Sequence, residues 1–77
     1  MKVEIIVTLK NGVLDPQGKA IQQTLNEMNF SEAKDIRQGK YFNIEMNIED
    51  KKKAKLKAEE MCKKLLANLV IEDYKIL

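Results

Sequence analysis

The 77-residue chain contains no histidine and no tryptophan, and it has one cysteine, one proline and three glycines. Without histidine there is no Ser-His-Asp or Cys-His nucleophile system, no histidine general base and no histidine-ligated zinc or haem. One cysteine cannot form a disulfide within the chain. The dispersed glycines match neither the dinucleotide fingerprint nor the Walker pattern. We therefore expect no catalytic residue, no metal and no cofactor on this chain alone.

The chain also lacks a large excess of either charge, because 14 Lys and Arg are set against 12 Asp and Glu, a net charge of +2. A nucleic-acid-binding domain is expected to be clearly basic. No apolar run approaches the roughly 20 residues that span a bilayer. Lys2 and Glu4 interrupt the early apolar segment, which is not the pattern of a secretory signal. We expect a cytoplasmic protein with neither nucleic acid nor membrane among its partners.

What is present is the composition of one folded domain over residues 1–77, with 44% hydrophobic and 34% charged residues. Residues 3–9 alternate between apolar and polar side chains, the period of a half-buried strand. Ile6 falls on the polar side of that strand. It is either an isolated surface residue or a sign that a partner covers the second face of the sheet, and the sequence leaves both open.

A helix is predicted over residues 16–29. Asp15 and Pro16 are a typical N-cap and first helical residue, and apolar side chains then recur at helical spacing. Gly18 in the first turn costs a helix about 1 kcal/mol relative to alanine. Its presence suggests a close approach of backbone, and we expect that approach to come from another chain.

The second half of the sequence predicts a hairpin, a helix and a last strand. Residues 32–37 are a short strand candidate, and residues 41–48 alternate cleanly after a turn at Gln38-Gly39. From Asp50 the period becomes helical, and residues 69–77 return to an extended pattern. The expected apolar stripe of this helix consists of Ala54, Ala58, Met61, Cys62, Leu65 and Leu66.

The order is strand, helix, strand, strand, helix, strand. This order predicts an α+β fold of the ferredoxin-like type, a β-α-β-β-α-β arrangement with one antiparallel sheet and both helices on one of its faces. The sequence reveals no internal repeat, linker or low-complexity segment.

The polar face of the second helix is rich in lysine, at positions 51, 52, 53, 55, 57, 63 and 64. A solvated helix surface accounts for such a face, because lysine stems cover apolar surface while their ammonium groups stay in water. Binding of nucleic acid or phosphate remains the alternative. Cys62, the only candidate nucleophile, lies within the apolar stripe, where a free cysteine packs as a small hydrophobic residue.

Three segments resemble the PurS family, the small subunits of phosphoribosylformylglycinamidine (FGAM) synthase. They are VTLKNGVLDPQG at 7–18, AKDIRQGK at 33–40 and CKKLLANLVIEDY at 62–74. Two departures are visible: Leu69 stands where the family usually has proline, and Ala33 replaces a larger apolar residue. Leu69 is a single change within the last motif, and Ala33 lies outside the first and last motifs, so the resemblance extends over essentially the whole chain.

The resemblance implies a non-catalytic adaptor in purine biosynthesis. In this family a large synthetase subunit binds ATP, Mg and formylglycinamide ribonucleotide, and a glutaminase subunit releases ammonia from glutamine. The resemblance implies that the small subunit brings the two together and that it forms a homodimer or a higher homo-oligomer, such as a tetramer. The expected partner-contact residues are Thr8, Lys10, Asp15, Pro16, Gln17, Gly18, Arg37, Lys40, Asn68, Glu72, Asp73 and Tyr74.

Two other functions compete with the adaptor hypothesis. A ferredoxin-like regulatory or RNA-binding module would use the lysines of residues 51–57 or a face of the sheet, and its nucleic-acid affinity would fall steeply with salt. A small independent enzyme would use Cys62, whose thiol would then react rapidly in the native protein.

Overall fold

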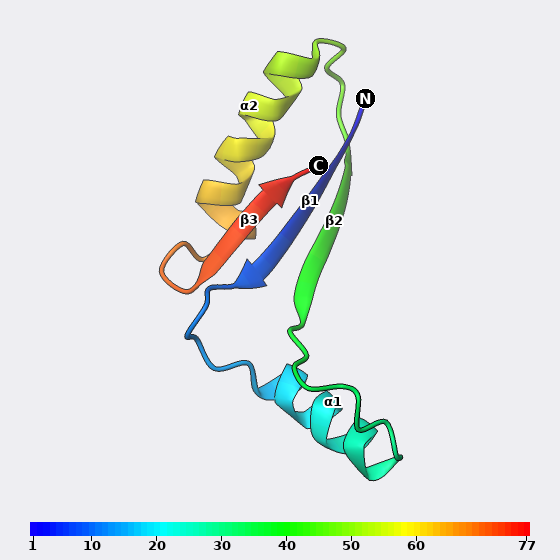
Figure 1. The fold of residues 1–77 in the computed structure, drawn as a ribbon. Helices are drawn as coiled ribbons and strands as arrows, with labels where there is room; N and C mark the ends of the chain where they lie inside the picture. Colours follow the sequence, from blue (N-terminus) through cyan, green and yellow to red (C-terminus); the bar gives the residue numbers. More distant parts are fainter.

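The structure, a computed structural model, describes residues 1–77 and contains one three-stranded antiparallel sheet (Figure 1). The central strand β1 (Lys2–Leu9) lies between β2 (Gly39–Glu45) and β3 (Glu72–Ile76). Both neighbours run antiparallel to β1. The alternation of residues 3–9 is realised as predicted, with one face of β1 in the core and the other toward solvent.

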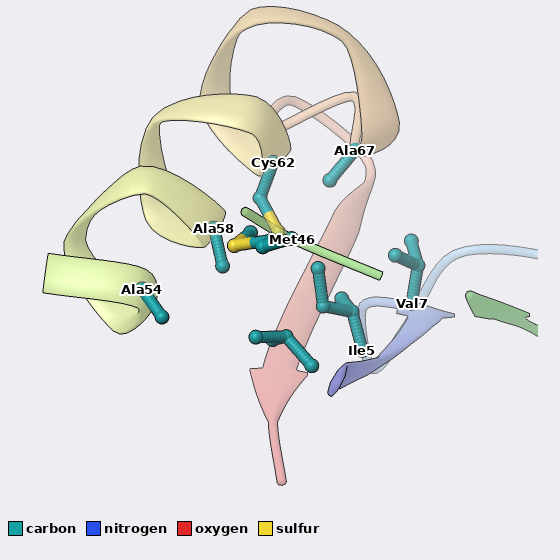
Figure 2. Close-up of a cluster of buried hydrophobic side chains, with 8 residues drawn as sticks. Ile5, Val7, Met46, Ala54, Ala58, Cys62 and Ala67 are labelled. Atoms are coloured by element: carbon teal, nitrogen blue, oxygen red, sulfur yellow. The ribbon is translucent and has the colours of Figure 1, made fainter. Parts of the chain in front are cut away.

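The helix α2 (Lys51–Met61) covers one face of this sheet (Figure 1). It presents Ala54 and Ala58, followed by Cys62, and these small side chains let the helix approach the strand closely. Ile5 and Val7 of β1 are fully buried beneath them (Figure 2). Burial of each of these two side chains contributes roughly 1.5–3 kcal/mol. The core is therefore a β1–α2 contact, to which Val3 of β1 also belongs and which Met46 and Ala67 complete.

A single π-helical turn, η1 (Cys62–Leu66), follows α2. It is closed by the Ala67 N–H donating to the Cys62 carbonyl at 2.9 Å. The wider turn carries Leu65 away from the sheet, so that 84% of its surface is exposed, and Met61 is 38% exposed. The predicted apolar stripe was wrong at these two positions. At Leu65 the reason is that a regular helical period cannot anticipate the extra residue in the turn. Met61 lies before the turn, as the last residue of α2, and is the less exposed of the two.

The α+β, ferredoxin-like class is confirmed, with a three-stranded antiparallel sheet and two helices. The arrangement differs from the expectation of both helices on one face. α1 (Pro16–Glu27) extends beyond the end of the sheet (Figure 1), and none of its residues belongs to the buried core. Residues 10–38, which contain α1 and are called the arm below, leave the sheet after β1 and return to it at β2.

The strand predicted over residues 32–37 is not formed. This segment returns beside α1, where the Gln22 side-chain amide donates to the Lys34 carbonyl. Its apolar residues, Ala33 and Ile36, are three positions apart, which does not fit the two-residue period of a strand. The sheet consequently has three strands rather than four.

The last strand is shorter than the predicted residues 69–77. The Asn68 carbonyl accepts from the Ile71 and Glu72 N–H groups, and its side chain accepts from the Val70 N–H. These bonds form a turn that delays the strand until Glu72. Ile76 packs against the core, while Leu77 is 61% exposed.

Neither helix has the length and the apolar character that crossing a membrane demands.

Candidate partner-binding site

The predicted contact residues gather where β1 ends and where β2 and β3 begin. Thr8 lies opposite Gly39 of β2 and Asp73 of β3, and Leu9 lies opposite Glu72. The arm joins the sheet at the same end (Figure 1). Three sequence segments that are far apart in the chain therefore meet at one end of the sheet.

Asp15 is the centre of this region and is only 4% exposed. One carboxylate oxygen accepts from the Gly18 N–H at 2.9 Å, which caps the start of α1 as the sequence predicted. The other oxygen accepts from the Gln38 N–H at 2.7 Å. One side chain thus ties the outgoing chain of the arm to the returning chain.

These bonds explain the acidity of Asp15. The Gln38 and Gly18 N–H groups, helped by the Arg37 charge, hold the pKa of its carboxyl below the usual value and outweigh its partial desolvation. The ionised carboxylate is therefore the state that the structure stabilises. With both oxygens occupied inside the chain, Asp15 positions the arm from within.

Gly18 permits a close backbone approach, but the approaching group belongs to the same chain. A Cβ atom at this position would fall on the Ile36 carbonyl oxygen and lie 2.7 Å from an oxygen of Asp15. The expectation of a close approach is confirmed, while its assignment to another chain was wrong for this contact. Any side chain at Gly18 would push apart the two segments of the arm that meet at this point.

Arg37 makes a second connection between the two ends of the arm. Its guanidinium donates to the carbonyl oxygens of Lys10 at 3.1 Å and Val13 at 3.2 Å, with a longer contact of 3.5 Å to Leu9. We call Asp15, Gly18, Arg37 and Gln38 the junction. It fixes the direction in which α1 leaves the sheet.

Sequence reasoning missed Gln38 as a functional position. The Asp-Pro-Gln-Gly motif signals the cap on Gly18, since that bond is local. The bond from Gln38 spans 23 residues and uses a backbone N–H, so no side-chain pattern marks it. Only the folded arm brings the two groups together.

A cavity of about 290 Å³, lined mainly by polar and charged residues, lies between the junction and the sheet. Glu72 contacts Lys40 at 3.5 Å across it and also accepts from the Asn68 N–H at 2.7 Å. The residues lining the cavity are Val7, Leu9, Asp15, Pro16, Gln17, Gln38, Gly39, Lys40 and Glu72. The cavity therefore contains five of the predicted contact residues, with most of their charges already paired.

The remaining predicted residues surround this cavity in different ways. Lys10 and Asp73 form an exposed ion pair at 3.5 Å. Thr8 is exposed on the face of the sheet away from α2, and Tyr74 lies half-buried against the core. Of the predicted contact residues, Thr8, Pro16, Gln17, Lys40, Asn68 and Asp73 are exposed, and Arg37 is exposed but partly engaged in the junction.

Cys62 lies outside this region, fully buried in the core (Figure 2). Burial raises the pKa of its thiol, and the charge of Glu59 raises it further. A raised pKa disfavours the thiolate that nucleophilic chemistry requires. The structure therefore gives Cys62 a packing role.

Comparisons with known proteins agree on one family. A family model described as "PurS: Phosphoribosylformylglycinamidine (FGAM) synthase" matches residues 2–77. The synthase subunit PurS of Bacillus subtilis is 49% identical over 74 residues, which cover 96% of this chain and 87% of that protein.

Solved structures agree as well. The crystal structure of PurS from Methanocaldococcus jannaschii matches with a TM-score of 0.90 and 47% identity, covering 99% of this chain and 92% of that one. A chain in the structure of PurLQS from Thermotoga maritima matches with a TM-score of 0.91 and 34% identity, over 99% and 93% of the two chains. The similarity thus includes the arm as well as the sheet.

Proposed function

The chain belongs to the PurS family, subunits of FGAM synthase in purine biosynthesis, and we propose that it is the adaptor that joins the synthetase subunit to the glutaminase subunit. In this proposal the synthetase subunit binds ATP, Mg and formylglycinamide ribonucleotide, and the glutaminase subunit supplies ammonia. The chain itself holds the two larger subunits in place and takes no part in the chemical steps. It acts in the cytoplasm, with the other two subunits.

Position matters to this reaction because ammonia passes between two active sites. A reactant held in place gains a large effective concentration over one that diffuses freely. A closed path also keeps ammonia from being lost to water or protonated there. A small subunit that holds the two sites in register is therefore essential without taking part in bond formation.

The extended shape of the chain is the observation that carries the proposal. Its dimensions are 48 × 24 × 14 Å, with a radius of gyration of 15.8 Å. A compact chain of this length is expected to have a radius of gyration of about 11.5 Å. The difference comes from the arm, which the junction holds away from the sheet and which presents apolar residues to solvent. Such a shape offers separate surfaces to separate partners.

The arm also supports the proposal that copies of this chain associate. Ile21, Met28 and Phe30 are between 43% and 59% exposed, so the chain itself leaves a large part of each side chain uncovered. Apolar surface of this kind on a projecting element is typical of an interface. We include a homodimer, or a tetramer built from it, in the proposed assembly.

Co-expression of the three subunits tests the adaptor function directly. The chain is expected to co-purify with the synthetase and glutaminase subunits when glutamine and ADP-Mg are present. Glutamine-dependent synthesis is expected to require the chain, while synthesis from added ammonium salts is expected to depend on it less. Failure to co-purify, or equal glutamine-dependent turnover without the chain, would contradict the proposal.

Asp15 and Tyr74 variants test which residues serve assembly. Asp15→Ala and Tyr74→Ala are made separately, and complex formation is measured beside the two activities. We expect assembly to weaken in both variants, through a misdirected arm in the first and a loosened β3 in the second. Unchanged assembly and glutamine-dependent turnover in both would remove this assignment of the site.

A further inference from the structure

An apolar groove lies between β2 and the end of α2, on the face of the sheet that α2 covers. Its volume is about 340 Å³. The lining consists of Ile44 of β2 and, from α2 and η1, of Lys57, Glu60, Met61, Lys64, Leu65 and Leu66. None of these residues belongs to the contact set predicted from the sequence.

The groove marks the place of a helix that the sheet lacks. A ferredoxin-like arrangement puts two helices on one face of the sheet. Here only α2 lies on that face, packed over β1 and β3 (Figure 1). Phe42 and Ile44 of β2 point to the same face and stay only half-buried. A second helix laid beside α2 would cover them.

α1 has an apolar side that fits this position. Ala20, Ile21, Thr24 and Leu25 line a shallow hollow of about 280 Å³ on successive turns of the helix. The Thr24 hydroxyl donates to the Ala20 carbonyl at 3.0 Å, so the hydroxyl in the hollow is already satisfied. The hollow therefore suits an apolar side chain.

Leu65 is the side chain of the groove that matches this hollow. It is 84% exposed, while Met61 beside it is 38% exposed. An exposed leucine by itself is ordinary. Helices pack together, however, when a side chain of one enters a hole formed by four residues of the other. Leu65 and the hollow of α1 have the shapes of such a pair.

The chain cannot bring its own α1 into its own groove. Asp15 and Arg37 bond the two ends of the arm together and hold α1 beyond the end of the sheet (Figure 1). None of the residues of α1 belongs to the buried core. The groove and the hollow can therefore meet only between two copies of the chain.

The charges of the two elements are complementary. The far half of the arm, residues 24–35, carries Glu27, Glu32 and Asp35 against Lys34, and none of the four forms an ion pair. Residues 51–66 of α2 and η1 carry seven lysines against two glutamates. Opposite charge favours contact of the arm with α2. Contact of one α2 with another would oppose like charges and leave both hollows empty.

We propose that two copies of this chain exchange arms, so that α1 of each copy lies in the groove of the other and Leu65 enters the hollow of α1. The inference rests on the association of copies in the proposed function and names the surface that receives the arm. A two-fold symmetric exchange uses the groove and the arm of both copies and leaves neither open.

Leu65→Asp alters the groove and Ile21→Lys alters the hollow. Sedimentation equilibrium over a concentration series gives the dissociation constant of the dimer. We expect either variant to raise it by about a hundredfold or more, because the contact occurs twice in a dimer and one buried apolar side chain accounts for about tenfold or more. Leu56→Asp is the matched control, since Leu56 is 61% exposed on the same helix and does not line the groove. It should leave the constant unchanged.

An equimolar mixture of Leu65→Asp and Ile21→Lys tests the exchange itself. In a mixed dimer, one contact joins an unaltered arm to an unaltered groove, and the other places the new lysine beside the new aspartate. We expect the mixture to form dimers at concentrations where each variant alone is a monomer. Thermal unfolding verifies that the variants fold, and Leu65→Ser or Thr24→Lys replaces one that does not.

The outcomes separate this inference from the function on which it rests. If the unmodified chain is a monomer at every concentration, the exchange and the proposed association both fail, and the adaptor function depends on co-purification alone. If the chain associates and Leu65→Asp associates equally well, another surface receives the arm and the exchange is overturned. If both variants are monomers and their mixture remains monomeric, each surface meets its own kind, which also overturns the exchange.

Discussion

At the scale of single residues, the Asp15 carboxylate accepts two backbone hydrogen bonds, and its sequence motif predicts only one of them. The cap on Gly18 is local, and the motif predicts it. The bond to Gln38 joins two chain segments and makes the carboxylate a tie between them. A residue predicted as a partner contact thus sets the direction in which α1 leaves the sheet.

The pH dependence of stability tests this role. Because the pKa of Asp15 is lower in the folded chain than its usual value of 3.8, its contribution is fully present above about pH 4. The contribution is lost as the pH falls through 3.8 toward the lower folded pKa. We expect Asp15→Asn to lower the melting temperature at pH 7 by about 5 °C in a domain of this size, because an amide has one acceptor oxygen and cannot accept from both the Gly18 and the Gln38 N–H groups. The difference from the unmodified chain should shrink below pH 4. A constant difference over the whole range would contradict the assignment.

Gly18→Ala separates helix propensity from crowding. Alanine favours a helix by about 1 kcal/mol over glycine. The new Cβ would, however, meet the Ile36 carbonyl oxygen, and such overpacking typically costs about 1–3 kcal/mol. We expect net destabilisation in urea unfolding, while Lys19→Ala at the exposed neighbouring position should be close to neutral. A more stable Gly18→Ala variant would show that nothing crowds this site.

Cys62 provides a test of the competing catalytic hypothesis. Its side chain is fully buried, and burial raises the pKa of the thiol. We expect an alkylating reagent at pH 8 to label the native chain far more slowly than the urea-unfolded chain. If the native chain were labelled as fast as the unfolded chain, the thiol would be accessible and reactive, and the catalytic hypothesis would stand.

At the scale of elements, the sequence predicted what local periodicity determines. β1, β2 and α2 follow from alternating or helical patterns, and the core that they form was foreseen at Ala54, Ala58 and Cys62. The position of α1 was not, because it depends on bonds from Asp15 and Arg37 to distant backbone groups. For the same reason, the sequence predicted which residues belong to the candidate site. It did not predict which of them form bonds within the chain and which remain exposed.

Removal of the arm tests whether the two parts are independent. No buried core residue comes from the arm. Replacing residues 11–37 with a short Asn-Gly turn should join β1 and β2 as a hairpin, since Thr8 already pairs with Gly39. We expect the circular dichroism of a folded sheet and helix, with cooperative unfolding, together with loss of assembly with the larger subunits. A variant without cooperative unfolding would show that the arm supports the core.

At the scale of the whole molecule, the projecting arm predicts association in solution. Burying Ile21, Met28 and Phe30 against other chains would recover apolar contact that the chain cannot make within itself. We expect sedimentation equilibrium to give a mass of at least two chains for the unmodified protein. Ile21→Lys should shift the equilibrium toward monomer, because a charge would replace an apolar contact.

Gln23→Lys is the matched control, since it adds the same charge at an exposed polar position of α1. It should leave the mass unchanged. If Ile21→Lys and the unmodified chain have the same mass, the exposed side of α1 does not join copies of this chain. Because the junction is intact in both variants, the arm would then remain available to the larger subunits. If three-subunit assembly is retained in Gln23→Lys and lost in Ile21→Lys, the larger subunits bind the apolar side of the arm.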